Sequence, residues 1–449
     1  MEIKGKNVLV FGSGISGVAA SRLLFEKGAN VVLYDGNEKL DAEKIQKEIG
    51  RETIVILGKF PEELLERTDL VVMSPGVPMD LPIVKSMQEK RIPVWGEVEL
   101  AYVCGKGDVF AITGTNGKTT TTTLLGEIMK QYKKSVFVVG NIGNPYTEAA
   151  LTMSEESVAV AEMSSFQLES IHTFRPKVSA VLNITPDHLN RHHTMEAYIA
   201  AKENIAMNQT AADTCVLNYE DDVLRELGEK TRAHVLYFSS KHRLEKGIFL
   251  EEGKIILRQE EEEVLCLVDE LQILGVHNYE NVMAAAAMAY AYGVPVAVIR
   301  KAVKAFAGVA HRIEFVAEKH GVAYYNDSKG TNPDAAIKGI QAMKRPTLLI
   351  GGGYDKDSSY EEWIDAFDGK VKKLVLLGDT REKIAATAKR KGFQEYLLVD
   401  TFEEAVKTCI ELACPGDAVL LSPACASWGM FRNYEERGDK FKELIQTLA

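Results

Sequence analysis

A Gly-rich turn that contains a lysine and threonines directly follows an apolar run. Residues 113–120 read Thr-Gly-Thr-Asn-Gly-Lys-Thr-Thr and come after Val109–Ile112. A strand that ends in such a turn and continues as a helix presents backbone N–H groups and the positive end of a helix dipole to phosphate. Lys118 can reach the β- and γ-phosphates, and the Thr119 hydroxyl can bind Mg²⁺. The full GxxxxGK[ST] pattern is not met, because Ile112 stands at its first glycine position. The segment nevertheless predicts that the chain uses ATP.

A second glycine pattern, GxGxxG, occupies residues 12–17, between an apolar run and a helical stretch. Asp35 ends the next apolar run, near the spacing of an acid that binds a ribose. Taken alone, this pattern indicates NAD, but any nucleotide diphosphate can use the same turn and helix N-terminus. The glycines could also serve tight packing alone. Ser74 follows a third apolar run and could flank the same ligand. The pattern predicts a nucleotide site without identifying the nucleotide.

Polar residues follow three apolar runs of the middle segment. Glu162 follows one run, Asn141 another, and Asp187-His188 a third. An acid at the carboxyl end of a strand beside a phosphate loop is well placed to bind Mg²⁺, although Glu162 could also cap the following helix. A lone histidine such as His188 is more often a surface or core residue than a ligand. Lys202 lies in an amphipathic helical pattern, where it is expected to be an ordinary helix lysine.

Further polar loops follow runs near the C-terminus. Residues 326–333, 351–356 and 422–427 each come after a short apolar run, and loops at strand ends describe the ligand crevice of an open α/β sheet. Each could be a plain surface turn, but the three together predict a site for a small anionic substrate. Asn278 opens an Ala-rich helix, where capping is the simplest role. The groups suited to an anion are Lys329, Thr331, Lys356 and Ser427.

Strand and helix patterns alternate along the chain and divide it into three α/β units. The first extends to about residue 96, the second to about residue 308, and the third from 309 to the end. Residues 247–257 are expected to form a hairpin that turns at Glu252-Gly253. The charge run at 260–263 is expected to be a solvated turn.

Composition restricts the class of protein. The 449 residues are 46% hydrophobic and 26% charged, as in globular proteins with packed cores. The net charge of −11 disfavours nucleic acid and anionic membranes as partners. The six cysteines form no CxxC pair and are expected to be reduced, mostly structural thiols. Because we find neither a signal peptide nor an apolar stretch that could span a bilayer, we expect a cytoplasmic protein.

Taken together and in order, these motifs resemble those of the Mur ligases, which build the peptidoglycan stem peptide. The series is GSGISG, TGTNGKTT, GNIG, EMSSFQLE, NITPDH, AAK, HNYEN, HR, NDSKGTNPDA, GGGYDK and SPACAS. It covers essentially the whole chain, and the C-terminal SPACASWGMFRNYEERGDKF is especially like the members that add D-glutamate. Gly330, where relatives often have Ala, is one of few departures. The first glycine pattern is then a site for uridine diphosphate, which replaces the NAD interpretation.

The resemblance implies three domains: an N-terminal Rossmann-like nucleotide-binding unit (1–96), a central P-loop ATPase-type α/β domain (97–308) and a C-terminal Rossmann-like α/β domain that binds the amino acid (309–449). It implies that ATP phosphorylates the carboxylate of UDP-N-acetylmuramoyl-L-alanine, and that D-glutamate then attacks the acyl phosphate. We expect a monomer whose partners are these small molecules.

The resemblance also implies residue roles and cofactors. Catalysis would rest on Lys118, Glu162, His188 and Lys202, with one Mg²⁺ on Thr119 and Glu162 and a second on His188 and Lys202, if Lys202 is carbamylated to N6-carboxylysine. ATP would contact Gly114, Thr115, Asn116, Gly117, Lys118, Thr119, Thr120, Asn278, Asn281, Arg312 and Asp327. The UDP-linked substrate would contact Ser13, Ile15, Ser16, Asp35, Gly36, Ser74, Asn141 and His188, and D-glutamate would contact Thr331, Lys356, Ser427 and Tyr434.

Other functions explain fewer of these motifs. A folylpolyglutamate synthetase shares the phosphate loop and the last α/β unit, but has no nucleotide unit before the loop. A muramyl ligase for diaminopimelate or lysine would carry a DNPR-like segment after the GGG loop, and none is present. An NAD-dependent oxidoreductase leaves the phosphate loop unexplained. A non-catalytic, ATP-gated binding module would not release ADP when an amino acid is added.

Overall fold

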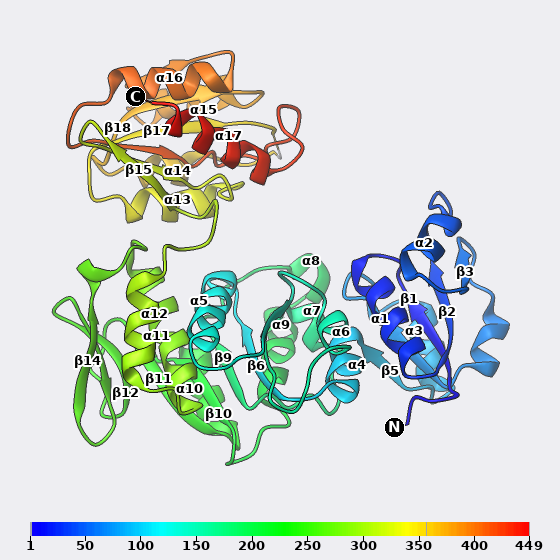
Figure 1. Cartoon of the computed structure of the whole chain (residues 1–449). Helices are drawn as coiled ribbons and strands as arrows, with labels where there is room; N and C mark the ends of the chain where they lie inside the picture. The colour runs from blue at the N-terminus through cyan, green and yellow to red at the C-terminus, as the bar shows by residue number, and fades with distance from the viewer. Residues whose placement is uncertain (1, 356, 449) are drawn as a thin grey trace. The chain divides into compact units, whose positions relative to one another are not determined.

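A computed structural model describes residues 2–355 and 357–448. These residues form three β-sheets, which confirms the predicted three-domain α/β fold (Figure 1). The chain also separates into two compact units, the first made of Met1–Leu267 with Glu280–Val303 and the second of Val268–Tyr279 with Lys304–Ala449. The first two sheets belong to the first unit and the third sheet to the second. The domain boundaries at 96 and 308 stay predictions.

The first sheet has five parallel strands in the order β3-β2-β1-β4-β5. The order reverses at β1, so the loops after β1 and β4 lie side by side at the carboxyl edge, where open sheets bind ligands. Apolar residues alternate between its faces, because Val8 and Val10 belong to one core cluster and Leu9 and Phe11 to another. The elements are β1 (Asn7–Phe11), α1 (Ile15–Glu26), β2 (Asn30–Asp35), α2 (Ala42–Ile49), β3 (Ile54–Leu57), a 3₁₀ turn (Glu62–Arg67), β4 (Leu70–Met73), α3 (Pro82–Glu89) and β5 (Val94–Gly96).

The second sheet has nine strands in the order β14-β13-β12-β11-β10-β9-β6-β8-β7. Strands β6 to β12 pair in parallel, and β13 and β14 add an antiparallel edge. The strands are β6 (Asp108–Thr113), β7 (Val136–Gly140), β8 (Val158–Glu162), β9 (Val178–Val181), β10 (Thr214–Asn218), β11 (His234–Ser239), β12 (Gly247–Glu251), β13 (Lys254–Arg258) and β14 (Glu262–Leu267).

The helices of this region include the one that follows the phosphate loop, α5, which packs against β7 and β8. They are α4 (Glu97–Cys104), α5 (Lys118–Lys130), α6 (Tyr146–Ala149), α7 (Ser165–Leu168), α8 (Leu189–His192), α9 (Met195–Glu203) with a 3₁₀ turn at Asn204–Ala206, α10 (Asp222–Lys230), a 3₁₀ turn at Val268–Glu270, α11 (Val276–Ala291) and α12 (Val296–Ala305).

The third sheet has six strands in the order β15-β16-β20-β17-β18-β19, parallel except at the β15 edge. Leu349 packs toward α13, α14 and α15, whereas Leu348 and Ile350 pack toward α16 and α17, so helices cover both faces. The elements are β15 (Glu314–Lys319), β16 (Val322–Asn326), α13 (Pro333–Ala342), β17 (Thr347–Gly352), α14 (Glu361–Asp365), β18 (Val371–Leu377), α15 (Arg381–Arg390), β19 (Tyr396–Leu398), α16 (Phe402–Leu412), β20 (Ala418–Leu421) and α17 (Tyr434–Gln446).

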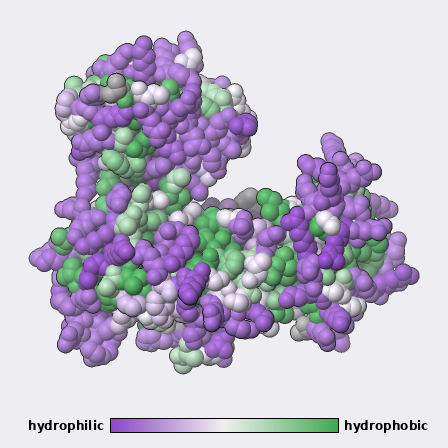
Figure 2. Space-filling view, in the orientation of Figure 1, coloured by the Kyte–Doolittle hydropathy of each residue, from purple (hydrophilic) through white to green (hydrophobic). Residues whose placement is uncertain are grey.

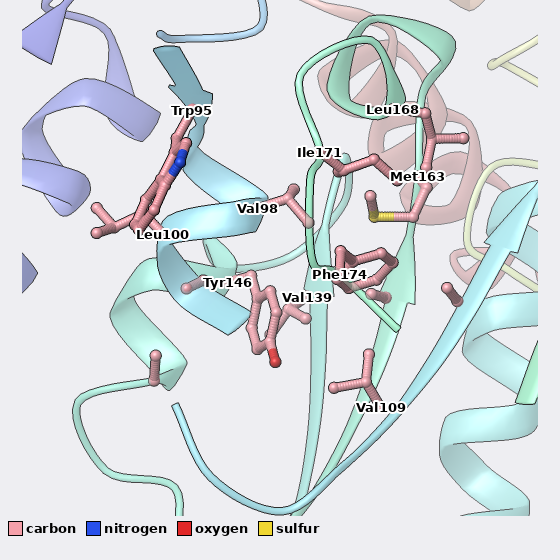
Figure 3. Packing of buried hydrophobic residues seen from close by; sticks show 14 of the residues in the cluster. Trp95, Val98, Leu100, Val109, Val139, Tyr146, Met163, Leu168, Ile171 and Phe174 are labelled. Carbon is pink, nitrogen blue, oxygen red and sulfur yellow. The ribbon is translucent and has the colours of Figure 1, made fainter. Parts of the chain in front are cut away.

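One apolar cluster continues from the first sheet into the second (Figure 3). Trp95 on β5 and Val98 and Leu100 on α4 belong to this cluster, as do Tyr146 on α6 and Phe174 in the segment before β9. Two buried carboxylates of α4 reinforce this junction. Glu97 accepts a hydrogen bond of 2.8 Å from Gln167, and Glu99 accepts bonds from the backbone N–H groups of residues 172–174. The shared core ties the two sheets of the first unit together.

Two local predictions are wrong, one of them only in part. Glu260 and Glu261 do lie in the exposed turn between β13 and β14, but Glu262 and Glu263 begin β14, where they pair with Arg258 and Leu257 of β13. An edge strand tolerates charged residues on its exposed face, so the charge run did not exclude a strand. Lys202 is not an ordinary helix lysine, because it is only 2% exposed. The hairpin at 247–257 is confirmed, with Glu252 and Gly253 both at positive φ.

Hydrophilic residues predominate on the face shown in Figure 2, and apolar residues gather in smaller patches. Within the described residues, no helix is long and apolar enough to cross a membrane. The six cysteines are free thiols, and four of them are buried, namely Cys215, Cys266, Cys409 and Cys425.

Candidate active site

The phosphate loop lies between β6 and α5 as predicted. Gly114 and Gly117 have φ of 147° and 87°, in the left-handed region that favours glycine. A Cβ atom at Gly117 would lie 2.2 Å from Oδ1 of Asn281, so a larger residue does not fit there. Nζ of Lys118 donates to the carbonyl oxygens of Gly114 and Thr115, at 2.8 and 2.9 Å. The lysine therefore lies over the loop that is expected to surround the phosphates.

The loop after β9 supports the phosphate loop. The carbonyl oxygen of Asn183 accepts from the N–H of Thr115 at 2.9 Å, and its Oδ1 accepts from the N–H of Asn116 at 2.8 Å. The Thr115 hydroxyl lies 3.1 Å from the hydroxyl of Tyr198 on α9. Since β6 lies between β9 and β8, this support comes from the strand on one side, and Glu162 extends from the strand on the other.

Glu162 ends β8 and pairs in register with Ile112, just before the phosphate loop. The side chain is 1% exposed. One oxygen, Oε1, accepts a 2.8 Å hydrogen bond from Asn141, while Oε2 is buried without a hydrogen-bond partner. A buried carboxylate oxygen requires a partner, and a hard cation such as Mg²⁺ is one. The residue therefore fits the predicted metal ligand. Among the described residues, however, no three His, Cys, Asp or Glu side chains group closely enough to hold a metal by themselves.

Lys202 extends from α9 to the phosphate loop. Its Nζ donates to the carbonyl oxygen of Gly114 at 2.8 Å and lies 3.4 Å from the Thr113 hydroxyl. Burial, and to a lesser extent the positive charge of Lys118, lower the pKa of Lys202 to about 7, while Asp187 opposes the shift. A substantial fraction of the amine is therefore neutral near neutral pH, and a neutral amine is the form that reacts with an electrophile.

His188 lies at the start of α8 with a left-handed φ of 53°. Its Nε2 is 3.5 Å from Oδ2 of Asp187, and its ring centroid is 5.0 Å from that of Phe166 on α7. The side chain is half exposed. His188 and Phe166 thus bring together the loop after β9 and the segment after Glu162.

At the first sheet, Asp35 organises the loop after β1. Its Oδ2 accepts from the backbone N–H and the hydroxyl of Ser13, at 2.8 and 2.7 Å. Burial opposes ionisation, but the hydrogen bonds from Asn37 and Ser13 hold the pKa of Asp35 below its usual value. The α1 N-terminus has no side-chain cap, so its N–H groups are available to an anion. Ser74 contacts the Gly12 carbonyl oxygen at 3.3 Å, whereas Ile15 is 80% exposed.

At the third sheet, the three predicted loops follow the adjacent strands β16, β20 and β17. Asp327 accepts from Ser422 at 2.7 Å and from the backbone N–H of Ile313 at 3.2 Å. Burial raises the pKa of Asp327 to about 7, although the Ser422 hydrogen bond and the positive charge of Arg312 oppose this. Nε of Arg312 is buried without a hydrogen-bond partner, so it can donate to a ligand.

The residues expected to contact D-glutamate are described in part. Ser427 is 3% exposed, and Thr331 is half-buried after Asp327. Tyr434 begins α17, and its carbonyl oxygen accepts a 2.8 Å hydrogen bond from Ser328. Lys356 lies outside the described residues.

Sequence reasoning missed Arg437, which is 1% exposed. Its guanidinium donates to the hydroxyl and carbonyl oxygens of Ser328 at 2.9 and 2.8 Å and to the carbonyl oxygen of Cys425 at 3.2 Å. It therefore joins the loop after β16 to the loop after β20. An arginine at helical spacing on a charged helix gives no signal of burial. Asn183 was quoted in a motif without a role, and its position at a strand end was the available signal.

Comparison with known proteins agrees with this arrangement. The model of the Mur ligase middle domain matches residues 112–289, that of the Mur ligase glutamate ligase domain matches 311–425, and that of the MurD-like N-terminal domain matches 6–96. The chain therefore belongs to the Mur ligase family.

Two examples illustrate the relatives that match over the full length. A UDP-N-acetylmuramoylalanine--D-glutamate ligase of Lachnoclostridium phytofermentans is 60% identical, with 100% of this chain and 99% of the relative covered. A protein of the same name from Lachnospira eligens is 55% identical, with 100% of both covered. Among solved structures, the MurF ligase of Thermotoga maritima in complex with ADP is similar in fold, with a TM-score of 0.58 and 18% identity over 100% of this chain and 97% of that one.

Proposed function

We propose that this chain is the ATP-dependent ligase that joins D-glutamate to UDP-N-acetylmuramoyl-L-alanine in peptidoglycan precursor synthesis, forming ADP and phosphate. The observation that carries this proposal is full-length identity of 60% and 55% to two ligases of that name. The phosphate loop, Glu162 and Lys202 supply groups that the reaction requires.

The substrate carboxylate and the γ-phosphate of ATP are both anions, so the reaction requires that their electrostatic repulsion be offset. The carboxylate of the UDP-linked substrate attacks the γ-phosphorus of ATP and gives an acyl phosphate and ADP. The amine of D-glutamate then attacks the acyl carbon, a tetrahedral intermediate forms, and phosphate leaves as the amide forms. Fixed positive charge stabilises the charge that develops on the transferred phosphoryl group. In the proposal, Lys118 moves from the Gly114 and Thr115 carbonyl oxygens to the phosphates and supplies that charge.

We propose two Mg²⁺ ions as cofactors. When bound, they neutralise phosphate charge and orient the reacting oxygens. Thr119 and the partnerless Oε2 of Glu162 would hold one, and His188 and Lys202 the second. For this role Lys202 is carbamylated: its neutral amine adds to CO₂ and releases a proton, leaving an N-carboxylate. The lowered pKa of Lys202 favours this addition.

The remaining residues bind the substrates in this proposal. Arg312, with its partnerless Nε, and Asp327 contact the nucleotide together with Asn278, Asn281 and Gly114–Thr120. The loop that Asp35 organises binds the uridine diphosphate, with contributions from Ser13, Ile15, Ser16, Gly36, Ser74, Asn141 and His188. D-glutamate contacts Thr331, Lys356, Ser427 and Tyr434. A cytoplasmic monomer, with only these small molecules as partners, completes the proposal.

The test is phosphate release with ATP, Mg²⁺ and UDP-N-acetylmuramoyl-L-alanine when D-glutamate, L-glutamate, L-alanine or meso-diaminopimelate is added. We expect turnover with D-glutamate alone. Turnover with another amino acid would support the ligase mechanism but contradict the proposed specificity for D-glutamate. No turnover with any of the four would overturn the proposed reaction.

A further inference from the structure

Ser165, His192 and Glu169 form a cluster of polar side chains that the proposed chemistry does not use: His192 hydrogen-bonds with Ser165 and lies beside the Glu169 carboxylate, which also accepts from Arg191 at 3.4 Å. Nε2 of His192 lies 2.9 Å from the Ser165 hydroxyl oxygen, and Nδ1 lies 3.2 Å from Oε1 of Glu169. A hydroxyl, an imidazole and a carboxylate in this order also occur in hydrolase triads. Here the serine is 2% exposed and the histidine 6% exposed, so no substrate reaches the hydroxyl. These contacts therefore support the structure and do not act on a substrate.

The histidine belongs to a helix that needs outside support. Helix α8 has only four residues, and a single turn has too few hydrogen bonds to be stable alone. His188 before it and His193 after it have φ of 53° and 67°, a region that is unfavourable for residues other than glycine. Tertiary contacts must hold this segment, and among its described side chains His192 is the buried one.

Contacts of α8 reach three parts of the expected site. The Phe166 ring stacks on His192 at 5.4 Å and lies 5.0 Å from His188. Arg191 donates to the Val77 carbonyl oxygen at 3.2 Å, in the loop that begins at Ser74. On the other side, the His192 ring lies 5.3 Å from the ring of Tyr198, whose hydroxyl contacts the phosphate loop.

We propose that His192 is a positioning residue: by hydrogen-bonding with Ser165 and stacking on Phe166, it holds the segment from His188 to His193 against α7, and so fixes His188 relative to the strand end that carries Glu162. This inference rests on the proposed function for the role of His188. It assigns a task to three polar side chains that contact neither substrate nor phosphate in the proposed reaction.

The test compares Ser165→Ala with wild-type protein by hydrogen–deuterium exchange without ligands. The reporters are the backbone N–H groups of residues 191–194, which bond within the segment. We expect their exchange to quicken roughly tenfold, since the local opening free energy falls when the buried imidazole loses a partner. The matched control is Ser179→Ala, which removes another buried serine of the same unit, one that donates to Gln209 at 2.8 Å.

Activity supplies the second readout. We expect Ser165→Ala to raise the Mg²⁺ concentration for half-maximal turnover by roughly tenfold, the usual scale for loss of a residue that orients a ligand. His192→Phe keeps an aromatic ring on Phe166 but removes the hydrogen bond with Ser165, so it should shift both readouts in the same direction, and it replaces Ser165→Ala if that variant does not fold. Exchange at 191–194 that matches the Ser179→Ala control in both variants would overturn the proposal. Failure of wild-type turnover would instead overturn the proposed function and leave the exchange result interpretable.

Discussion

At the scale of single residues, Lys202 differs from an ordinary surface lysine in both its burial and its pKa. Its pKa of about 7 means that the amine is mostly charged below pH 7 and mostly neutral above it. We therefore expect a lysine carbamate signal in NMR spectra with carbon-13-labelled bicarbonate, which weakens as the pH falls through 7. The signal should be absent from Lys202→Ala. That variant should be nearly inactive and partly rescued by acetate, and full activity without acetate dependence would contradict the carbamate.

Lys118 allows a second prediction at this scale. Lys118→Ala should lower kcat by an amount equivalent to about 3 kcal/mol of transition-state stabilisation, as expected for loss of one preorganised charge. Lys130→Ala removes a lysine from the far end of the same helix, where it pairs with Glu127 on the surface, and serves as the control. Steady-state kinetics with saturating ATP would check this, and a near-normal kcat for Lys118→Ala would remove the lysine from the mechanism.

At the scale of elements, the glycine loop after β1 can be tested through two neighbouring positions. A Cβ atom at Gly17 would lie 1.8 Å from the Gly12 carbonyl oxygen, whereas one at Gly14 would meet nothing within 4 Å. We expect Gly17→Ala to lower the free energy of unfolding by about 1–3 kcal/mol, the usual range for overpacking, and Gly14→Ala to change it little. Urea denaturation followed by circular dichroism would compare them. Equal stability of the two variants would show that the loop adjusts freely.

The helices and strands also differ in how well the sequence predicts them and their contacts. Strands with polar loops at their carboxyl ends were predictable, because the alternation of strand and helix patterns and the turn residues between them are local signals in the sequence. In the structure, those loops do follow adjacent strands. Burial of Lys202 was not predictable from its helix alone, since its contacts Thr113 and Gly114 come from β6 and the phosphate loop. The joining of two loops by Arg437 likewise depends on its contact with Ser328, which lies 109 positions away along the chain. Such long-range contacts leave no periodic signal.

At the scale of the whole molecule, the residues proposed to bind each ligand are distributed differently between the two compact units. Residues assigned to the UDP-linked substrate all lie in the first unit, and described residues assigned to D-glutamate all lie in the second. Those assigned to ATP lie in both, since Lys118 belongs to the first unit and Arg312 to the second. A ligand that binds only folded protein stabilises the part that it contacts.

Each ligand should therefore shift unfolding differently. At 100 times its dissociation constant, UDP-N-acetylmuramoyl-L-alanine should stabilise the first unit by about 2.7 kcal/mol and leave the second unchanged. A non-hydrolysable ATP analogue with Mg²⁺ should stabilise both units. Urea unfolding followed by hydrogen exchange at β8 for the first unit and β17 for the second would separate the two. Because Asn278, Arg312 and Asp327 are the second unit's proposed nucleotide contacts, protection by the analogue at β8 alone would remove them from the ATP site.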